Sequence, residues 1–508
     1  MTSTRPAARP PAPGSAEARL GGAVPAPRAA VPDVAPLTAL RRWLVRRLFP
    51  LLATAGLIAV GMVSTTWGAH LVGGWEAHLT GKPALALPAD LWATLAAAGR
   101  LVRMDLGGLY TPPTRLVAFP GAALILVPVV AVIDAAGLGL AAPSAADPHP
   151  AAWLLAGPYE MALSCVALFA ADSIADRMGV ARSRRALLAA AEAVALGNVS
   201  LAGGHPEDAV AVALLLFGVL ALCDSRAARS AWLTGAAVAV QPLVLLALPI
   251  VVAVLEPRRL AGYLTRAAAP SAVLLGAAAA ANWKATLRAV ISQPNWPAID
   301  HPTAWATLAP HMSGGAVAAG PARALAVVVV CGCALVVRRR WRGTRRMARW
   351  SPEFLAELLW WVAAALAARC VFEPVMVGYY LWPTLAVALV TASRSWPRLI
   401  ATSLAAVILT FVSGAGWQGR WSWWAPMVAG LGLTLFLARV PQRSGASQAA
   451  LPAPALSPSR GSGGLTPATV LNASVEHWGT STSAARGSFR RWPQSVAGPW
   501  RRCTKIRR

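Results

Sequence analysis

ALLAAAEAVALGNVSLAGGHPEDAVAVALLLFGVLALC, residues 186–223, places one polar hexapeptide between two apolar runs. Each run is close to the length that a helix needs to cross much of a bilayer core of ~30 Å. Proline discourages helix at the residue before it and paired glycines loosen the backbone, so Gly203-Gly204-His205-Pro206-Glu207-Asp208 is predicted to turn between two spans. A polar connector is the ordinary interpretation of such a turn. Three titratable groups in four residues are dense for so apolar a chain, and this favours a functional rim at one membrane face.

The composition is that of a membrane protein. Of 508 residues, 56% are hydrophobic and only 13% are charged, and the apolar residues occur in runs. Helices satisfy their own backbone polar groups in lipid, and the alternation typical of membrane barrels is absent. We therefore expect an all-α, polytopic membrane protein with roughly 11–13 transmembrane or half-membrane helices.

The net charge of +26 comes mainly from arginine in loops and tails. In a soluble protein this excess would point to nucleic acid. Here the enrichment of basic residues in cytoplasmic loops explains it, and no nucleic-acid partner is expected. The excess of arginine, alanine and proline is typical of a GC-rich genome, and the expected location is a bacterial plasma membrane. The six cysteines form no metal-ligand pattern.

Three regions are predicted along the chain. Residues 1–40 are rich in proline, alanine and arginine and form a flexible cytoplasmic leader. Residues 41–439 form the transmembrane domain, with its two large loops, residues 67–115 and 282–320, outside the cell. Residues 440–508 form a basic cytoplasmic tail, for which contact with anionic lipid headgroups is the physical expectation and a solvated tail is the alternative. Both termini are then cytoplasmic.

The topology before residue 185 has two solutions. Residues 116–140 and 151–171 are both apolar, but two spans there would leave the arginine-rich loop at residues 177–185 outside the cell. Either residues 84–99 enter or cross the membrane, or one of the two later segments is broken into short helices. Prolines in both later segments favour the second solution. Residues 91–102 also have the pattern of an amphipathic surface helix.

The segment at residues 232–255 has basic residues beyond both ends and Gln241-Pro242 near its middle. This pattern predicts a hairpin of two short helices that turns at Gln241. Gln241 and the apolar-segment acid Glu160 are the polar groups of a possible transport site. A neutral, hydrogen-bonded carboxyl between helices is the alternative for Glu160.

Polar outliers collect on the predicted outer face. Carboxylates and imidazoles there can bind hydroxyl groups or remove a proton, and aromatic rings can pack on sugar rings. An ordinary belt of aromatic residues at the membrane interface is the competing interpretation of the tryptophans and tyrosines. The candidate binding residues are His205, Glu207, Asp208, Gln241, Trp296, Asp300, His301, Arg369, Glu373, Tyr379 and Tyr380.

Arg369 and Glu373 are four residues apart, which permits an ion pair if the helix continues between them. Alternatively, the planar guanidinium of Arg369 suits a phosphate. Phosphate-binding glycine loops, dinucleotide fingerprints and metalloprotease motifs are absent from the sequence. An activated donor is therefore expected to reach the site through the membrane.

Four features resemble the polytopic C-type glycosyltransferases that use lipid-linked sugars, especially the actinobacterial mannosyl- and arabinosyl-type enzymes. A long first loop contains Asp105 before Gly107-Gly108-Leu109-Tyr110, and a short turn contains Gly204-His205-Pro206-Glu207-Asp208. The segment from Trp232 through Gln241-Pro242 and Leu248-Pro249 to Arg258-Arg259 is similar to the family's paired short helices. Arg369, Phe372-Glu373-Pro374 and Tyr379-Tyr380 complete the likeness, which covers about residues 43–437 as a layout.

The resemblance implies a transferase that moves a sugar from a polyprenyl-phosphate donor to a cell-envelope glycan or glycolipid. In the family, a first-loop carboxylate is the base or binds a metal, which points to Asp105, with Glu76 as the next choice. The first loop lacks the family's acidic pair, so no cofactor is assigned and a divalent metal stays open. The other classes carried forward are a transporter or flippase and a non-catalytic assembly protein.

Overall fold

The computed structural model describes residues 36–67, 89–112, 114, 116, 118–141, 150–292, 294–298, 300–342, 350–414 and 419–439. Most of the predicted leader, all of the predicted tail and Glu76 lie outside these residues. Residues 36–40 of the predicted leader belong to the helix α1 (Pro36–Arg46), so the leader is helical at its end.

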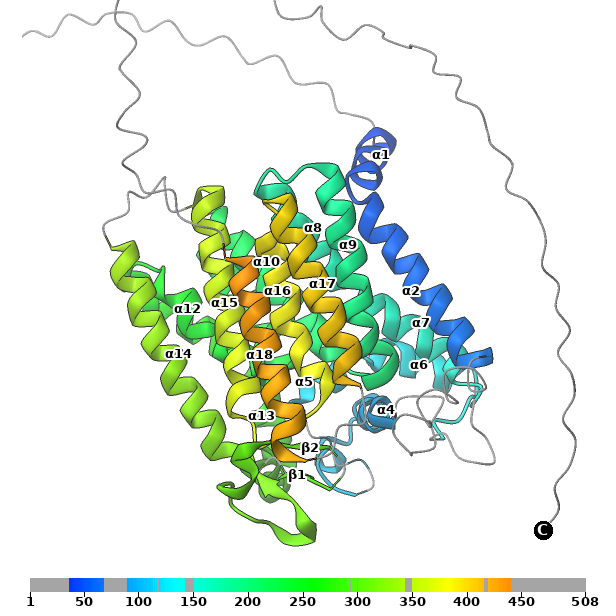
Figure 1. Cartoon of the computed structure of the whole chain (residues 1–508). Coiled ribbons are helices and arrows are strands. Elements are labelled where there is room, and N and C mark those ends of the chain that lie inside the picture. Colours follow the sequence, from blue (N-terminus) through cyan, green and yellow to red (C-terminus); the bar gives the residue numbers. More distant parts are fainter. Residues whose placement is uncertain are drawn as a thin grey trace, which may run out of the picture. The chain divides into compact units, whose positions relative to one another are not determined.

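The described chain is a helical bundle (Figure 1). Seven helices are long and apolar enough to cross a membrane, or eight if the bent pair at residues 40–46 and 48–63 is one span. The predicted all-α, polytopic class is confirmed in this coarse form. The long helices are α2 (Leu48–Trp67), the pair α7 (Trp153–Ser164) and α8 (Val166–Arg177), α10 (Pro206–Cys223), α13 (Pro257–Ser292), α14 (Gly320–Trp341), α15 (Pro352–Phe372), α17 (Trp396–Ser413) and α18 (Arg420–Ala438).

Shorter helices complete the bundle and explain why fewer spans than predicted reach full length. An α-helix rises about 1.5 Å per residue, so helices of 6 to 16 residues fall short of a ~30 Å core. These helices are α9 (Arg182–Gly197), α11 (Ala227–Val240), α12 (Leu248–Ala253) and α16 (Trp382–Ala392).

The helix of the first loop runs across the bundle rather than through it (Figure 1). Figure 1 views α4 (Ala89–Val102) end-on, at a large angle to the long helices. The apolar segment at residues 116–140 does not form one continuous helix, because its described residues form the short helices α5 (Pro120–Leu124) and α6 (Val127–Ala135). Proline stands in the first turn of each helix, where it cannot continue a preceding helix. The broken-segment solution is therefore the one observed.

The predicted hairpin at Gln241 is present. Helix α11 ends at Val240, Gln241 is extended, and the 3₁₀ helix η3 (Pro242–Leu246) precedes α12. The predicted loop at residues 282–320 begins later than expected, because α13 only kinks at Asn282 and continues to Ser292. The Asn282 side chain accepts a hydrogen bond from the backbone of Ala285 at 3.2 Å, which starts the helix again after the kink.

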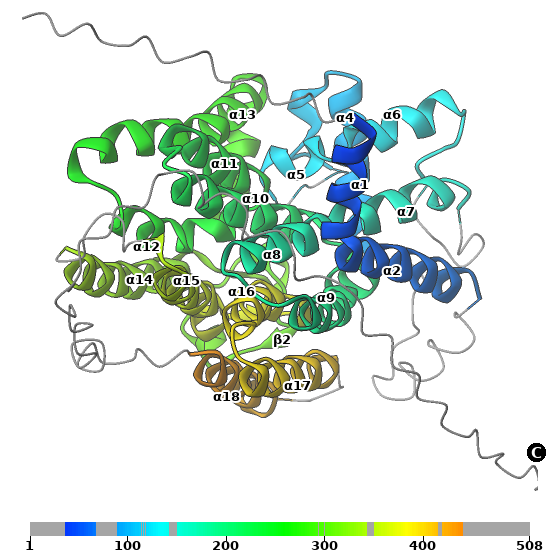
Figure 2. The same cartoon turned by 90° about the horizontal axis from the view of Figure 1, so that it is seen from above.

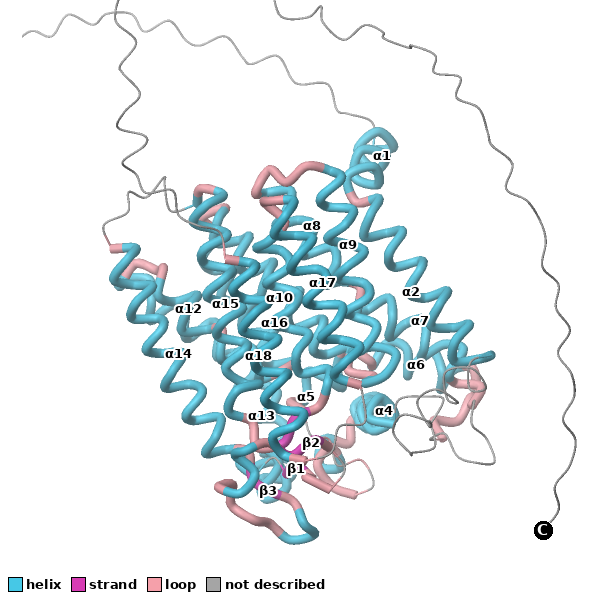
Figure 3. Tube along the Cα trace, in the orientation of Figure 1, coloured by secondary structure: helices cyan, strands magenta, loops and turns pink. Residues whose placement is uncertain are grey.

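Short strands join the second loop to the turn after α15. Strand β1 (Pro294–Asn295) pairs with β3 (Val317–Ala318), and β2 (His301–Pro302) pairs with β4 (Val375–Met376), both antiparallel. Along the chain, the 3₁₀ turns η4 (Ala304–Thr307) and η5 (Ser313–Gly315) lie between β2 and β3. Figure 3 shows the strands and α4 at one end of the bundle, which we call the site end.

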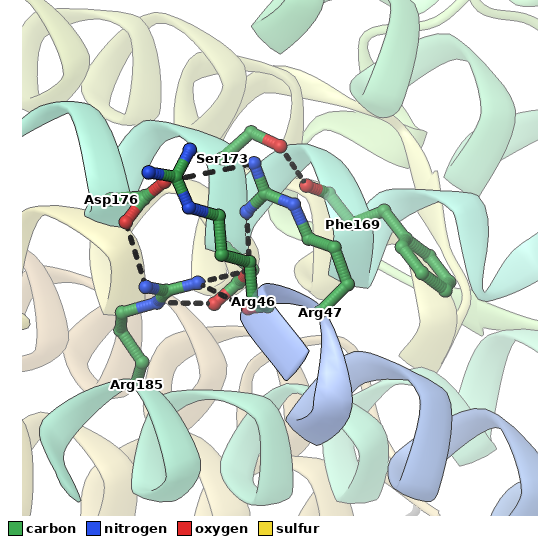
Figure 4. Close-up of polar contacts among 7 residues, drawn as sticks. Arg46, Arg47, Phe169, Ser173, Asp176 and Arg185 are labelled. Atoms are coloured by element: carbon green, nitrogen blue, oxygen red, sulfur yellow. Dashed lines mark hydrogen bonds and ion pairs between the residues drawn. The ribbon is translucent and has the colours of Figure 1, made fainter. Parts of the chain in front are cut away.

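At the opposite end, the first long helix is tied to α8 and α9 by a buried ionic cluster (Figure 4). Arg47 and Arg185 both bind Asp172, with Nε of Arg185 at 2.6 Å from Oδ1 of Asp172. Arg185 also binds Asp176 at 2.8 Å and donates to the carbonyl oxygen of Arg46 at 2.8 Å. The side chain of Asp172 is only 2% exposed, so its two arginines are needed to offset the cost of burying its charge.

Candidate functional site

The predicted turn at residues 203–208 forms at the site end, between α9 and α10. One π-helical turn, η2 (Asn198–Gly203), extends α9, and Gly204 then adopts φ 65°, a left-handed conformation that glycine favours. Pro206 starts α10, where its missing N–H costs nothing. Glu207 and Asp208 therefore lie in the first turn of α10, where the helix dipole stabilises negative charge.

His205 is held between two carboxylates. Its Nδ1 lies 2.7 Å from Oε1 of Glu207, and its Nε2 lies 3.2 Å from Oδ2 of Asp90. Burial lowers the pKa of His205, but the charge of Glu207, the hydrogen bonds with Asp90 and Glu207 and the charge of Asp208 raise it overall to about 10. His205 is therefore an imidazolium at neutral pH.

Asp90 is the site residue that the sequence analysis did not select. It lies in the first turn of α4, and its side chain is 67% exposed. The hydrogen bond with His205 lowers the pKa of Asp90 despite partial burial. An exposed, ionised carboxylate can accept a proton from a bound hydroxyl group, although its lowered pKa makes it a weaker base than a carboxylate matched to neutral pH. An acid at the start of a predicted surface helix was visible in the sequence, but its partner lies 115 residues away.

Asp105, the predicted base, has different contacts. It caps the 3₁₀ turn η1 (Leu106–Gly108), accepting a hydrogen bond from the Gly108 backbone at 3.0 Å. Nη1 of Arg100 lies 2.6 Å from Oδ2 of Asp105, and this hydrogen bond lowers the pKa of Asp105. The hydrogen bonds and the ion pair of Asp105 with the described residues are local, and none of them reaches His205.

The contacts of His205 with Asp90 and Glu207 form one polar cluster. A second polar cluster surrounds Glu373, which is fully buried. Nη2 of Arg323 lies 2.5 Å from Oε1 of Glu373, and the amide of Asn295 donates to the same oxygen at 3.0 Å. The predicted pairing of Arg369 with Glu373 is present at 3.8 Å, because α15 continues to Phe372. Burial opposes ionisation of Glu373, but Arg323 and Arg369 together hold its pKa below the ordinary value.

Arg369 keeps unused capacity for hydrogen bonding. Its Nη1 is buried and has no hydrogen-bond partner among the described residues. Its guanidinium carbon lies 3.5 Å from the centroid of the Tyr380 ring. An unpaired buried donor is costly, so an anion placed against Arg369 would be strongly favoured.

Asp208 and Gln241 connect the polar cluster around His205 to the one around Glu373. Nε2 of Gln241 donates to Oδ1 of Asp208 at 2.5 Å, while Oδ2 of Asp208 is buried without a partner among the described residues. Asp208 also interacts electrostatically with His205 and Arg369. Gln241 thus lies at the site end beside the first turn of α10. The predicted cluster of His205, Glu207, Asp208, Gln241, Arg369 and Glu373 is assembled as one site.

A cavity of about 270 Å³ adjoins this cluster. Its polar lining is at Gln241, Arg323, Arg369 and Glu373, and the remainder is mainly apolar, from η3, α13, α14 and Phe119. In the 18-residue apolar stretch of each helix, only 11% of the residues of α13 and 22% of those of α14 are buried in the protein, against 83% for α10. The cavity therefore lies beside the helices that face outward from the bundle, as the view in Figure 2 illustrates for α13 and α14.

Three further predicted residues, Trp296, Asp300 and His301, lie on the second loop. The His301 ring stacks on Trp423 at 4.4 Å between centroids, and strand β2, which contains His301, pairs with β4 beside Glu373. The backbone N–H of Asp300 donates to the carbonyl oxygen of Trp296 at 3.2 Å, so these two residues shape a turn. Glu160 is buried in α7 and accepts a hydrogen bond from Ser164 at 3.1 Å, the bonded carboxyl that the sequence offered as an alternative.

A divalent metal finds no ready set of ligands in the described part of the chain, where no three histidine, cysteine or acidic side chains are placed to share one ion. Asp90 and Glu207 already contact the two nitrogens of His205.

Comparison with models of known protein families and a search of curated proteins returned no match to this chain. The geometry of the site is therefore the basis for the functional argument.

Proposed function

We propose that this protein is an integral membrane glycosyltransferase that moves a sugar from a polyprenyl-phosphate donor to an extracytoplasmic cell-envelope glycan or glycolipid. The observation that carries the proposal is the cavity, whose apolar walls lead to one polar end at Arg369. A lipid-linked phosphate has the same division, with an apolar chain, one anionic group and a sugar beyond it. Membrane lipids would surround the outward-facing helices α13 and α14.

Arg369 would bind the donor phosphate. Its fork-shaped guanidinium matches two phosphate oxygens, and its buried Nη1 lacks a partner among the described residues. Glu373 is shared with Arg323, so it does not fully neutralise the two arginines. The surplus positive charge would also stabilise the phosphate as it leaves, which is where negative charge develops.

Asp90 would remove the proton from the acceptor hydroxyl. That oxygen would then bond to the anomeric carbon as the bond from that carbon to the phosphate oxygen breaks, with both electrons leaving on the lipid phosphate. The His205 imidazolium, held by Glu207, would orient Asp90. Asp90 therefore replaces Asp105 as our proposed base, because its contact with His205 connects Asp90 to the assembled site.

The test compares purified variants in proteoliposomes. Radiolabelled polyprenyl-phosphate mannose and arabinose would be supplied with a cell-envelope acceptor fraction, and transfer would be followed with time. Asp90→Asn and Arg369→Gln should abolish transfer, whereas Asp134→Asn and Arg266→Gln, which alter exposed residues on α6 and α13, should retain it. Full activity in Asp90→Asn would rule out the proposed base.

The broken hairpin at Gln241 also suits a transporter or flippase, since such helices often line substrate paths. Movement of a fluorescent polyprenyl phosphate across the proteoliposome membrane, without sugar transfer, would decide for this alternative. Neither transfer nor movement, together with retained binding of envelope proteins, would favour a non-catalytic assembly role.

A further inference from the structure

One short segment, η7 (Gly378–Leu381), contacts two cationic side chains of the site, His205 and Arg369. The Tyr379 ring lies 4.1 Å from the His205 ring between centroids, and the Tyr380 ring lies 3.5 Å from the guanidinium carbon of Arg369. The two tyrosine rings are themselves in edge contact at 4.9 Å, with planes at 87°. The sequence analysis selected both tyrosines only as sugar-binding or interfacial rings.

The backbone of η7 packs closely against η2 and α17. A Cβ atom added to Gly203 would lie 3.0 Å from Cδ1 of Tyr379, and one added to Gly378 would lie 2.8 Å from Oγ of Ser413. Asn198 donates to the same Ser413 oxygen at 3.3 Å. These contacts hold η7 against the loop that carries His205, so the Tyr379 ring has a defined position beneath the imidazole.

The two cations come from different elements. His205 precedes α10, whereas Arg369 lies in the last turn of α15. Their in-plane partners differ as well, since Asp90 and Glu207 bind His205 while Glu373 binds Arg369. Asp208 interacts electrostatically with both cations. The direct ring contacts to both come from the adjacent tyrosines.

We propose that Tyr379 and Tyr380 are positioning residues that fix the His205 imidazolium and the Arg369 guanidinium at a set separation through their ring faces. An aromatic face attracts a cation, more strongly when water is excluded. The proposal rests on the proposed function, in which His205 orients the base and Arg369 binds the donor phosphate. The tyrosine pair would then keep the acceptor-activating and phosphate-binding halves of the site in register.

The first test measures the pKa of His205, and it does not require any sugar transfer. Histidine-labelled protein in nanodiscs would be titrated by NMR, with the His205 signal assigned from its loss in His205→Gln. Tyr379→Leu should lower the pKa of His205 by about one unit, since the ring face no longer stabilises the charge, whereas Tyr379→Phe should leave it nearly unchanged. Equal pKa values in the Leu and Phe variants would overturn the role of Tyr379.

The second test uses polyprenyl phosphate itself as the probe, with binding measured in nanodiscs. Tyr380→Leu should weaken binding about tenfold, and Tyr380→Phe should restore it to within about twofold. Tyr110→Leu and Tyr110→Phe form a matched control pair, because Tyr110 contacts the Ala118 carbonyl instead. Equal affinities for Tyr380→Leu and Tyr380→Phe would overturn the role of Tyr380.

Sugar transfer then separates the two proposals. Tyr380→Leu should raise the KM for the donor and Tyr379→Leu should lower kcat, each rescued by phenylalanine. If the wild type transfers no sugar but the titration and binding results hold, the proposed function fails and the positioning role stands. If the wild type transfers sugar and the leucine variants match the phenylalanine variants in all three measurements, the positioning role fails alone.

Discussion

Nε2 of His205 lies 3.2 Å from Oδ2 of Asp90, a residue 115 positions earlier in the chain. This contact brings the surface helix α4 to the first turn of α10. The other ring nitrogen contacts Glu207, so His205 is held from both sides. The contact places an exposed carboxylate of the first loop beside the buried acids of the bundle.

Replacing the two first-loop acids separately will identify the base. Asp90→Asn should lower sugar transfer by about 100-fold or more, because the amide cannot accept the proton. Asp105→Asn removes a local cap and the pairing with Arg100, so transfer should fall by no more than a few-fold. Initial rates in proteoliposomes at equal protein content provide the measurement. The reverse order of losses would restore Asp105 as the base.

The stability of the folded protein should decrease from neutral to alkaline pH because of His205. Its folded pKa is raised to about 10 from the ordinary 6.5. The stabilisation is therefore complete below about pH 6.5, diminishes as the unfolded histidine loses its proton, and is gone above about pH 10. The Tm in detergent should fall by several degrees across this window, and His205→Gln should remove that component of the fall. An identical pH dependence in both proteins would contradict the prediction.

Glu373 should be important for stability as well as for the site. It is fully buried between Arg323 and Arg369, so Glu373→Gln leaves two arginines without their carboxylate. Breaking a buried ion pair from one side costs about 3–5 kcal/mol. Glu353→Gln is the matched control, because the Glu353 side chain, which pairs with Arg394, is 65% exposed. This substitution should lower the free energy of unfolding by less than about 1 kcal/mol. Denaturation in mixed micelles can compare the two; similar losses would argue against the network.

Asp172 should tie the first long helix to the bundle. Asp172→Asn deprives Arg47 and Arg185 of their shared partner and should cost about 3–5 kcal/mol. Asp176→Asn should cost less, because Asp176 is 36% exposed. Protease protection of α2 in proteoliposomes, alongside unfolding, gives a readout local to that helix. A stable Asp172→Asn variant with α2 fully protected would show that apolar packing alone holds it.

The broken segment at α5 and α6 makes a prediction about sidedness. Because α5 and α6 do not cross the bundle, a cysteine at Asp134 should be labelled from the same side as one at Asp300. A cysteine at Asp224, after α10, should be labelled from the opposite side. An impermeant maleimide on intact cells, using a variant without native cysteines, measures this. Labelling of positions 134 and 300 from opposite sides would mean that residues 116–140 cross the membrane.

Local patterns in the sequence anticipated much of the bundle. Apolar runs and flanking arginines predicted α10 and the hairpin at Gln241, because these features depend on neighbours within a few residues. The four-residue spacing of Arg369 and Glu373 likewise permitted their contact. Pro120 and Pro128 also favoured a broken segment at residues 116–140, and each stands in the first turn of a separate short helix.

By itself, the sequence determined that this chain forms apolar helices and which polar residues cluster at one turn. Backbone hydrogen bonding and burial act over short stretches of chain, so such features can be predicted locally. Only the tertiary structure decided that Asp90 meets His205 and that Arg323 meets Glu373 across 50 residues. These pairings depend on how whole helices pack against one another, and no spacing along the chain encodes that.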